Sequence, residues 1–151
     1  MTTVESTLEH KELIGSWFIV DIKDLNSSAF TDVGGLSVEV GVTEVAGTTL
    51  KGDGVTRRVA GLVTYGELSL KRNLTDDKFF YTWARLIFDG KPNFRREGSI
   101  HLCDMGGKIL STWEFKNAWP SKWSASDLSA GTADPMKEEV TLQVEFLKRT
   151  K

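Results

Sequence analysis

Residues 109–127, ILSTWEFKNAWPSKWSASD, decide the fold that we expect for this chain. Polarity alternates along the first half with a period of two, which is the pattern of a β-strand whose successive side chains point to opposite faces. Proline lacks an amide donor and restricts the residue before it, so Pro120 is expected to end this strand or to open a turn at Trp119. One face should carry Ile109, Ser111, Trp113 and Phe115, and the other Leu110, Thr112, Glu114 and Lys116.

Three tryptophans lie within this stretch, at positions 113, 119 and 123. Indole rings bury a large apolar area, which is more than a lone surface hairpin would carry. We therefore expect a core strand followed by an aromatic plug at the mouth of a barrel. The alternative is that a neighbouring subunit covers part of this aromatic surface.

The chain has 151 residues, of which 40% are hydrophobic and 26% charged, and its formal net charge is −2. These values fit one domain with its own core and give no indication of electrostatic binding to nucleic acid or anionic membranes. We expect a flexible N-terminal arm over residues 1–12 and one β domain over residues 13–151. The arm is not a secretory signal, and no run approaches the ~20 apolar residues of a membrane helix. We therefore expect synthesis in the cytoplasm and no stable membrane anchor.

Hydrophobic periodicity places the other strands and one helix. Residues 13–22 are apolar on both faces, which is typical of a strand covered on both sides or covered by another chain. Thr75 is expected to cap a helix over residues 76–88, with Asp76 and Asp77 beside the positive end of the helix dipole. Further strands are expected at residues 36–45, 63–72, 97–104 and 138–147.

Six or seven strands with one mid-chain α-helix predict a mainly β protein: a small antiparallel β-barrel or sandwich of two packed sheets. Asn73 is expected to adopt a positive φ between a strand and the helix. Residues 46–58 are too polar for a core and too long for a tight turn, and such loops are usually functional or disordered. Residues 124–134 are expected to form a second long loop.

The sequence lacks the arrangements that are typical of an active site. His101 and Cys103, the only cysteine, share one face of a strand, but two ligands do not complete a zinc site. Asp76 and Asp77 are adjacent on the predicted helix and do not converge on one substrate. Residues 52–54 lack the spacing and the lysine of a phosphate-binding loop. We therefore expect no catalytic residue, no metal site, no cofactor and no enzymatic activity.

A second function is suggested by the start of the chain. Gly15-Ser16-Trp17 matches the Gly-x-Trp opening of lipocalins, which are small ligand-binding barrels. The match has two fixed residues, and the lipocalin helix follows the barrel strands, whereas the helix predicted here lies mid-chain. A lipocalin-like carrier of a small ligand is therefore kept as the alternative.

Three segments together resemble the tail tube protein family of contractile phages, which includes the inner-tube proteins of phage-tail-like contractile injection systems. They are VAGLVTYGELSLKRNLTDDKFFYTWARL (59–86), WEFKNAWPSKWSASDL (113–128) and EEVTLQVEFLKR (138–149). The resemblance spans residues 16–149. The chain departs from the family pattern at Asn73, where glycine is frequent, and at Val45-Ala46-Gly47, where the family commonly has an acidic residue and glycine.

The resemblance implies a structural role. Family members form hexameric rings in which each subunit has two packed sheets and one helix, and six copies line a continuous channel. The rings stack into a tube inside a contractile sheath, with a baseplate and tube-terminating proteins. DNA or protein cargo passes through, and the assembly is a virion tail or a phage-tail-like particle.

Two sets of residues are expected to serve such an assembly. The loop over residues 46–58 should reach the adjacent subunit or ring, with the arm and the second loop as secondary contacts. The polar side of two strands should face the channel. The expected contact residues are Gly47, Thr48, Thr49, Leu50, Lys51, Asp53, Arg57 and Arg58. The expected channel-facing residues are Glu39, Thr43, Glu67 and Ser69.

Overall fold

A computed structural model describes residues 12–23, 27–125 and 136–151. The expected arm, apart from residue 12, and most of the expected loop over residues 124–134 lie outside these ranges. The described elements are β1 (Trp17–Ile22), β2 (Ser28–Phe30), β3 (Asp32–Gly34), β4 (Val38–Thr48), β5 (Gly54–Tyr65), β6 (Leu68–Asn73), α2 (Phe79–Phe88), β7 (Arg96–Cys103), β8 (Ile109–Ala125), β9 (Lys137–Gln143) and β10 (Phe146–Arg149).

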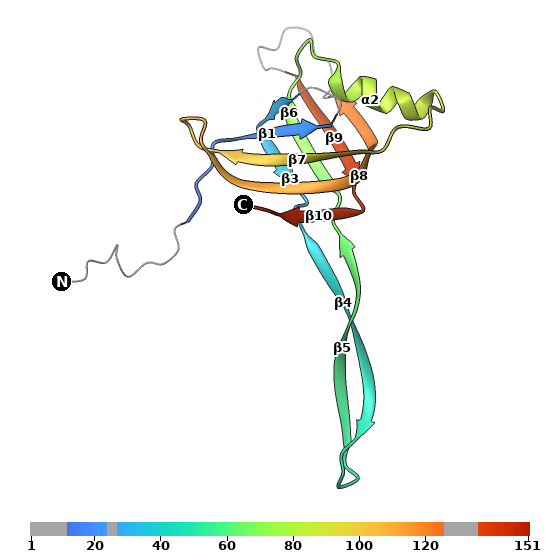
Figure 1. Cartoon of the computed structure of the whole chain (residues 1–151). Helices are drawn as coiled ribbons and strands as arrows, with labels where there is room; N and C mark the ends of the chain where they lie inside the picture. Colours follow the sequence, from blue (N-terminus) through green and yellow to red (C-terminus); the bar gives the residue numbers. More distant parts are fainter. Residues whose placement is uncertain (1–11, 24–26, 126–135) are drawn as a thin grey trace, which may run out of the picture.

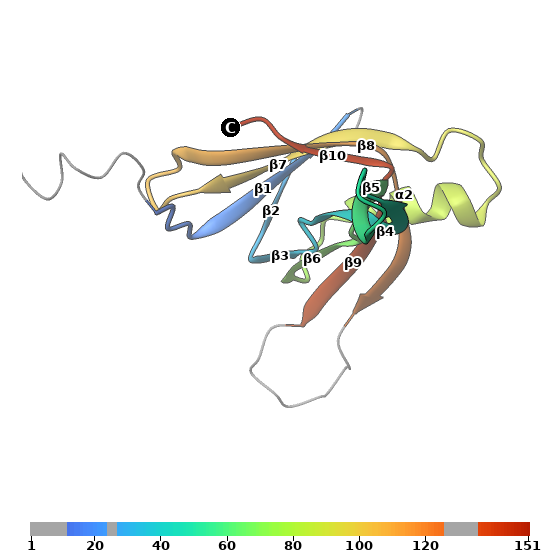
Figure 2. The same cartoon turned by 90° about the horizontal axis from the view of Figure 1, so that it is seen from below.

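Two sheets share the long strand β8. Strands follow the order β2-β1-β7-β8-β9-β6-β3, and β10 also pairs with β8. The first half of β8 lies in sheet A with β2, β1, β7 and β10, and its second half lies in sheet B with β9, β6 and β3. The two layers diverge from β8 (Figure 2). The predicted mainly β sandwich with two sheets and a mid-chain helix is confirmed, and the sheets stay open rather than closing into a barrel.

The core lies between the two sheets, and the amphipathic helix α2 adds a cluster of aromatic side chains to it. Phe80 and Trp83 are fully buried, and Trp83 Nε1 donates a hydrogen bond to the carbonyl oxygen of Phe94 at 2.6 Å. Phe80 packs edge to face on Phe30 of β2, with ring centroids 5.2 Å apart. The sheets contribute Val20, Ile22, Phe30, Leu68, Leu70, Ile100, Phe115, Ala118, Val140, Leu142 and Leu147.

A buried ion pair joins two neighbouring strands of sheet B at one end of the core. Arg72 Nε of β6 lies 2.7 Å from Glu138 Oε2 of β9, and both side chains are less than a tenth exposed. Trp123 Nε1 of β8 donates to the other carboxylate oxygen of Glu138 at 2.7 Å. Arg72 also reaches Asp77 Oδ2, at 3.4 Å, just before α2. Four elements of the chain thus meet at two charged groups that satisfy each other.

The helix begins later than the sequence predicts. α2 starts at Phe79, and its N-cap Lys78 makes no side-chain hydrogen bond to the helix. Asp77 instead accepts a bond from the Phe79 amide at 3.0 Å, while Thr75 accepts one from the Asp77 amide at 3.2 Å. The predicted cap at Thr75 is therefore wrong, because these two side chains close turns ahead of the helix.

Pro120 does not end β8, which continues to Ala125. Pairing with β9 shifts register between Pro120 and Lys122, and such an irregularity is where a strand tolerates a residue without an amide donor. Asn117, three residues earlier, has φ 54° and is the only non-glycine residue with a positive φ in the described ranges. The positive φ expected at Asn73 is therefore found at Asn117 instead.

The expected last strand, residues 138–147, is divided in two. β9 ends at Gln143 and pairs with β6 and β8 in sheet B, whereas β10 begins at Phe146 and pairs with the first half of β8 in sheet A. The crossing moves Leu147, rather than Phe146, into the core. This crossing places both halves of the segment on the strand that joins the two sheets.

Candidate assembly surface

Strands β4 and β5 form a separate two-stranded sheet that projects away from the two main sheets (Figure 1). We call β4, β5 and the turn between them the hairpin, and the remaining described structure the body. The strands pair from Val38↔Tyr65 to Thr48↔Gly54. The turn is closed by a bond from the Thr49 amide to the carbonyl oxygen of Asp53, at 2.8 Å. The long loop predicted over residues 46–58 is therefore wrong, since most of it is strand.

The hairpin is not covered by the rest of the described chain. No residue of β4 or β5 is buried, and Val42 and Leu62 are 68% and 84% exposed. A two-stranded hairpin alone is at best marginally stable in water, and a large exposed apolar surface marks a site of interaction. The large apolar residues exposed here are Val38, Val40, Val42, Val45, Leu50, Val55, Val59, Leu62 and Val63.

The register assigns the hairpin side chains to two faces, because alternate residues of a strand point to opposite sides. In agreement with this, Arg58 Nε lies 3.5 Å from Glu44 Oε1 across the strands. A register shift between Val40 and Val42 interrupts the pairing at Gly41. One face carries Glu39, Thr43, Val45, Val55, Arg57 and Val59, and the other Val38, Val40, Val42, Glu44, Arg58, Ala60 and Val63. Each face thus mixes valine with charge.

The structure brings the eight expected contact residues together at the far half of the hairpin. Gly47 and Thr48 end β4, Arg57 and Arg58 lie in β5, and the other four belong to the turn. Leu50 is fully exposed at the tip. Sequence reasoning did not single out the valines at positions 38, 40 and 42, which the structure leaves exposed, because their alternation also fits an ordinary core strand.

The four expected channel-facing residues lie on the hairpin, in the connection that follows it and in β6. Glu39 and Thr43 share a face of β4, as the register shows. Glu67 lies between β5 and β6, and Ser69 lies within β6. Ser69 is half-buried and donates a hydrogen bond to Glu139 Oε1 at 3.2 Å. Ser69 thus lies within sheet B, and Glu39 and Thr43 are neighbours on the hairpin.

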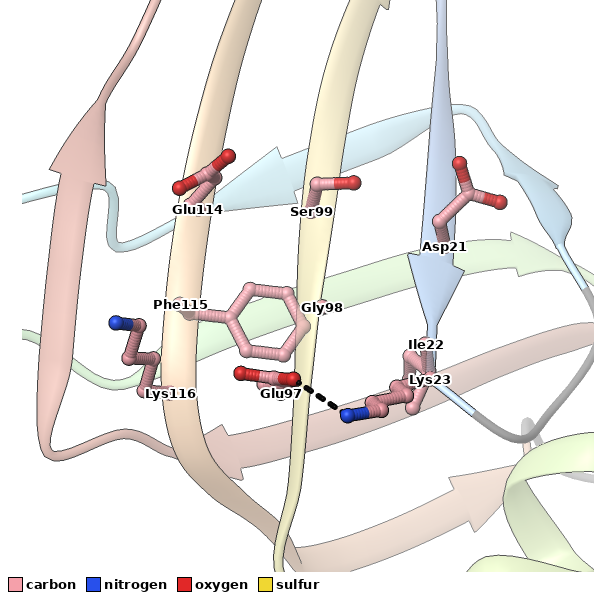
Figure 3. A pocket seen from close by; sticks show the side chains of 9 residues that line it. All are labelled: Asp21, Ile22, Lys23, Glu97, Gly98, Ser99, Glu114, Phe115 and Lys116. Carbon is pink, nitrogen blue, oxygen red and sulfur yellow. Dashed lines mark ion pairs between the residues drawn. The ribbon is translucent and has the colours of Figure 1, made fainter.

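A shallow hollow of about 410 Å³ lies over β1, β7 and β8 of sheet A (Figure 3). Acidic and basic side chains alternate around it, and Lys23 Nζ lies 3.1 Å from Glu97 Oε1. Gly98 forms its floor beside the ring of Phe115, its pairing partner on β8. The hollow is open to solvent, and Lys23 and Glu97 at its rim pair with each other.

His101 lies beside this hollow and is held by its strand neighbours. Its ring nitrogens lie 3.0 Å from Ser99 Oγ and 2.9 Å from Thr112 Oγ1, and 3.4 Å from Asp21 Oδ2. Cys103 is buried, and burial, together with the negative charge of Asp104, raises the pKa of its thiol. A raised thiol pKa disfavours the thiolate that nucleophilic or metal chemistry requires. In the described ranges, no group of three or more His, Cys, Asp and Glu residues is placed to hold a metal ion.

An open β-sandwich that projects an apolar hairpin into solvent is the architecture of a subunit that associates with other chains. The family comparison agrees with this class. Residues 15–148 match the family model of the T4-like virus tail tube protein gp19, and the chain belongs to this family. No curated protein matches the sequence. In the part of the chain that the structure describes, no helix has the length and apolar character needed to cross a membrane.

Solved structures share the fold over nearly the whole chain. A chain from the sheath–tube complex of the PVC extracellular contractile injection system aligns with a TM-score of 0.72 and 19% identity, over 99% of this chain and 98% of that one. A chain from the anti-feeding prophage cap gives 0.72 and 18%, over 100% and 99%. Hcp1 from Salmonella typhimurium gives 0.55 and 13%, over 90% and 86%. At these sequence identities, the comparison with solved structures shows a shared fold.

Proposed function

We propose that this protein is a structural subunit of the inner tube of a contractile tail or phage-tail-like injection particle. Six copies form a ring, the rings stack into a tube, and DNA or protein cargo passes through the central channel. The subunit has no enzymatic role. It is made in the cytoplasm and functions within the assembled particle.

The uncovered hairpin is the observation that carries this proposal. The hairpin holds nine exposed large apolar residues, eight of them in its strands, and each strand has one edge without a pairing partner in the described structure. Open apolar edges invite uncontrolled aggregation unless another chain pairs with them. A closed ring supplies that partner at every subunit and leaves no open edge, because each interface is heterologous and the rotation closes.

The partners follow from the family and from the assemblies that hold chains of this fold. Such chains come from a sheath–tube complex, a baseplate, a tube-terminating cap and a sheath/tube terminator. We propose that this subunit likewise contacts a sheath protein, a baseplate and a tube-terminating protein. The far half of the hairpin, Gly47–Arg58, contacts the adjacent subunit or ring.

The lipocalin-like alternative finds no specific support. A carrier needs a closed barrel around an internal cavity, and here the sheets stay open. The space between them is filled by aromatic side chains, among them Phe30, Phe80, Trp83 and Phe115, each at most 1% exposed. No observation therefore favours a ligand-binding function over the tube subunit.

Electron microscopy and sedimentation velocity of the purified protein test the proposal. We expect rings or tubes from the wild type. Val42→Lys should leave the circular dichroism of the subunit unchanged and prevent assembly, because a charge on an edge strand blocks association. Phe88→Lys, at a site on α2 that is equally exposed (67% against 68%), is the matched control and should assemble. A monodisperse wild-type monomer, or normal tubes from Val42→Lys, would contradict the proposal.

A further inference from the structure

A second hollow, of about 320 Å³, adjoins the one in Figure 3 and shares part of its rim. We call it the basic hollow, because four of its six lining residues are cationic. It lies where β1 ends, where β7 begins and beside the middle of β8. A concave site lined mainly by one sign of charge attracts an ion of the other sign. The lining residues are Lys23, Arg95, Arg96, Glu97, Lys116 and Asn117.

The carboxylates beside the basic hollow already have partners in the subunit. Glu97 Oε1 lies 3.1 Å from Lys23 Nζ. Glu145 forms an ion pair with Arg95, and its Oε2 accepts a hydrogen bond from Asn117 Nδ2 at 3.1 Å. These two carboxylates therefore balance two of the four cations and leave the other two unbalanced.

The two unbalanced cations are Arg96 and Lys116, neither of which forms an ion pair within the described ranges. Lys116 is exposed, and its Nζ lies 5.5 Å from the ring centroid of Phe146. Nε of Arg96 is buried and has no hydrogen-bond partner, and no other buried side-chain nitrogen or oxygen of the described residues lacks one. A buried donor without an acceptor is costly, and a ligand that supplies the acceptor removes that cost.

The backbone brings these cations together through an irregularity between two strands. The pairing of β7 with β8 shifts register between Arg96 and Gly98, so that Lys116 and Asn117 both lie opposite Glu97. Asn117 is the residue with φ 54°. Bulges of this kind redirect side chains and are frequent next to functional sites, where strained backbone conformations also gather. The irregularity thus turns side chains of both strands toward one space.

We propose that the basic hollow binds an acidic segment of a partner protein, with one carboxylate on Arg96 and a second on Lys116. A carboxylate accepts paired hydrogen bonds from a guanidinium and supplies the acceptor that Nε of Arg96 lacks. Nucleic acid fits the site less well, because its phosphates repeat along a backbone and are bound by a series of cations. Here the cations are confined to one hollow with two carboxylates beside it, on a chain whose formal net charge is −2.

The partner is a different protein rather than a second copy of this chain. The described ranges contain two pairs of adjacent acidic residues, Asp76-Asp77 and Glu138-Glu139. Glu138 is buried against Arg72, and Asp77 reaches the same guanidinium at 3.4 Å. Neither pair can therefore offer two free carboxylates to another copy. The inference adds a contact with another protein to the proposed self-association, and it does not rest on how the copies are arranged.

Binding of a fluorescently labelled hexaglutamate peptide to the purified full-length protein tests the site. Anisotropy at low salt should show binding by the wild type that weakens as salt is added, and a hexaglutamine peptide should not bind. Arg96→Gln and Lys116→Gln should each weaken binding by about fivefold or more, because each removes one charged partner of the peptide. Arg85→Gln, at a half-exposed arginine on α2, is the matched control and should bind like the wild type. Circular dichroism checks that all variants are folded, and the exposed site of Lys116 keeps the test valid if Arg96→Gln is not.

Assembly and DNA binding identify the occupant. Arg96→Gln should form the same rings or tubes as the wild type. A wild type that does not bind hexaglutamate, or an Arg96→Gln variant that binds it equally well, would overturn the inference. It would also be overturned if a short DNA duplex bound more tightly than the peptide and depended on Arg96, or if Arg96→Gln alone failed to assemble, which would make a second copy the occupant. A wild type that binds the peptide but never assembles would contradict the proposed function and leave this inference standing.

Discussion

In the body, Arg72 pairs with Glu138 at 2.7 Å with both side chains less than a tenth exposed, whereas in the hairpin Arg58 lies 3.5 Å from Glu44 with both more than half exposed. The valines of the two regions differ in the same way. Val140 in sheet B is fully buried, and Val42 in β4 is 68% exposed. The residue types are alike, but the body covers its own side chains and the hairpin does not.

This difference shows which part of the fold the chain completes by itself. A buried side chain contributes to the stability of the lone subunit, while an exposed one contributes only when another chain covers it. Substitutions in the body should therefore lower the free energy of unfolding of the unassembled subunit. Equivalent substitutions in the hairpin should leave that free energy nearly unchanged and weaken the association of subunits. Three matched pairs of variants test this separation.

The largest effect is expected from an aromatic residue of the body. Trp83→Ala empties a fully buried site and removes the bond to the carbonyl oxygen of Phe94, and we expect a loss of about 3–5 kcal/mol in the free energy of unfolding. Leu62→Ala in the hairpin, where the side chain is 84% exposed, should change it by less than about 0.5 kcal/mol. Urea denaturation of the dissociated subunits measures both. Equal losses in the two variants would show that the hairpin is packed in the lone subunit.

The body was largely predictable from the sequence, because its pattern is local. Alternation along β8 correctly placed Ser111 and Phe115 on one face, where both are buried, and hydrophobic periodicity found α2, although with an earlier start. The division of the last strand after Gln143 was not predictable, since the alternation of β9 continues without a break into Phe146. That boundary is set by pairing with β8, a contact between distant parts of the chain.

The hairpin was harder to predict for a related reason. Residues 46–58 are rich in glycine, threonine and charge, which indicates a loop when the segment is taken alone. Its strands are held by pairing with each other over the full length of β4. The far end was nevertheless expected to contact a neighbour, and the structure gathers those residues at the tip. The acidic residues of β4 and the basic residues of β5 can be read from the sequence, but the sequence alone does not show that the two segments pair with each other.

A smaller effect is expected from the two ion pairs. Glu138→Gln removes a buried carboxylate that Arg72 and Trp123 both contact, and leaves the guanidinium with Asp77 as its remaining charged partner. Breaking a buried pair in this way should cost about 3 kcal/mol in the free energy of unfolding. Glu44→Gln should cost less than about 0.5 kcal/mol, because exposed ion pairs contribute little. Thermal unfolding in the same buffer compares the two variants. A similar loss of stability in both would show that the hairpin pair is as important to the lone subunit as the buried pair of the body.

The smallest effect concerns two glycines that differ in how closely other atoms approach them. A Cβ added at Gly98 would lie 2.3 Å from the carbonyl oxygen of Asp21 and 2.8 Å from Cζ of Phe115, whose ring lies beside Gly98 in Figure 3. A Cβ at Gly41 would have its closest contact at 3.4 Å, to the carbonyl oxygen of Leu62, which is an ordinary distance. Gly98→Ala should therefore destabilise the dissociated subunit by about 1–3 kcal/mol through overpacking.

Gly41→Ala should leave the dissociated subunit unchanged or stabilise it slightly, because alanine has less freedom than glycine in the unfolded chain. The two variants add the same methyl group, so a difference between them in urea denaturation reports the surroundings alone. If Gly41→Ala lost as much stability as Gly98→Ala, Gly41 would have to be packed within the lone subunit. If it kept its stability but assembled poorly, the methyl group would meet an atom that only a neighbouring copy supplies, at the point where the pairing of β4 and β5 is interrupted.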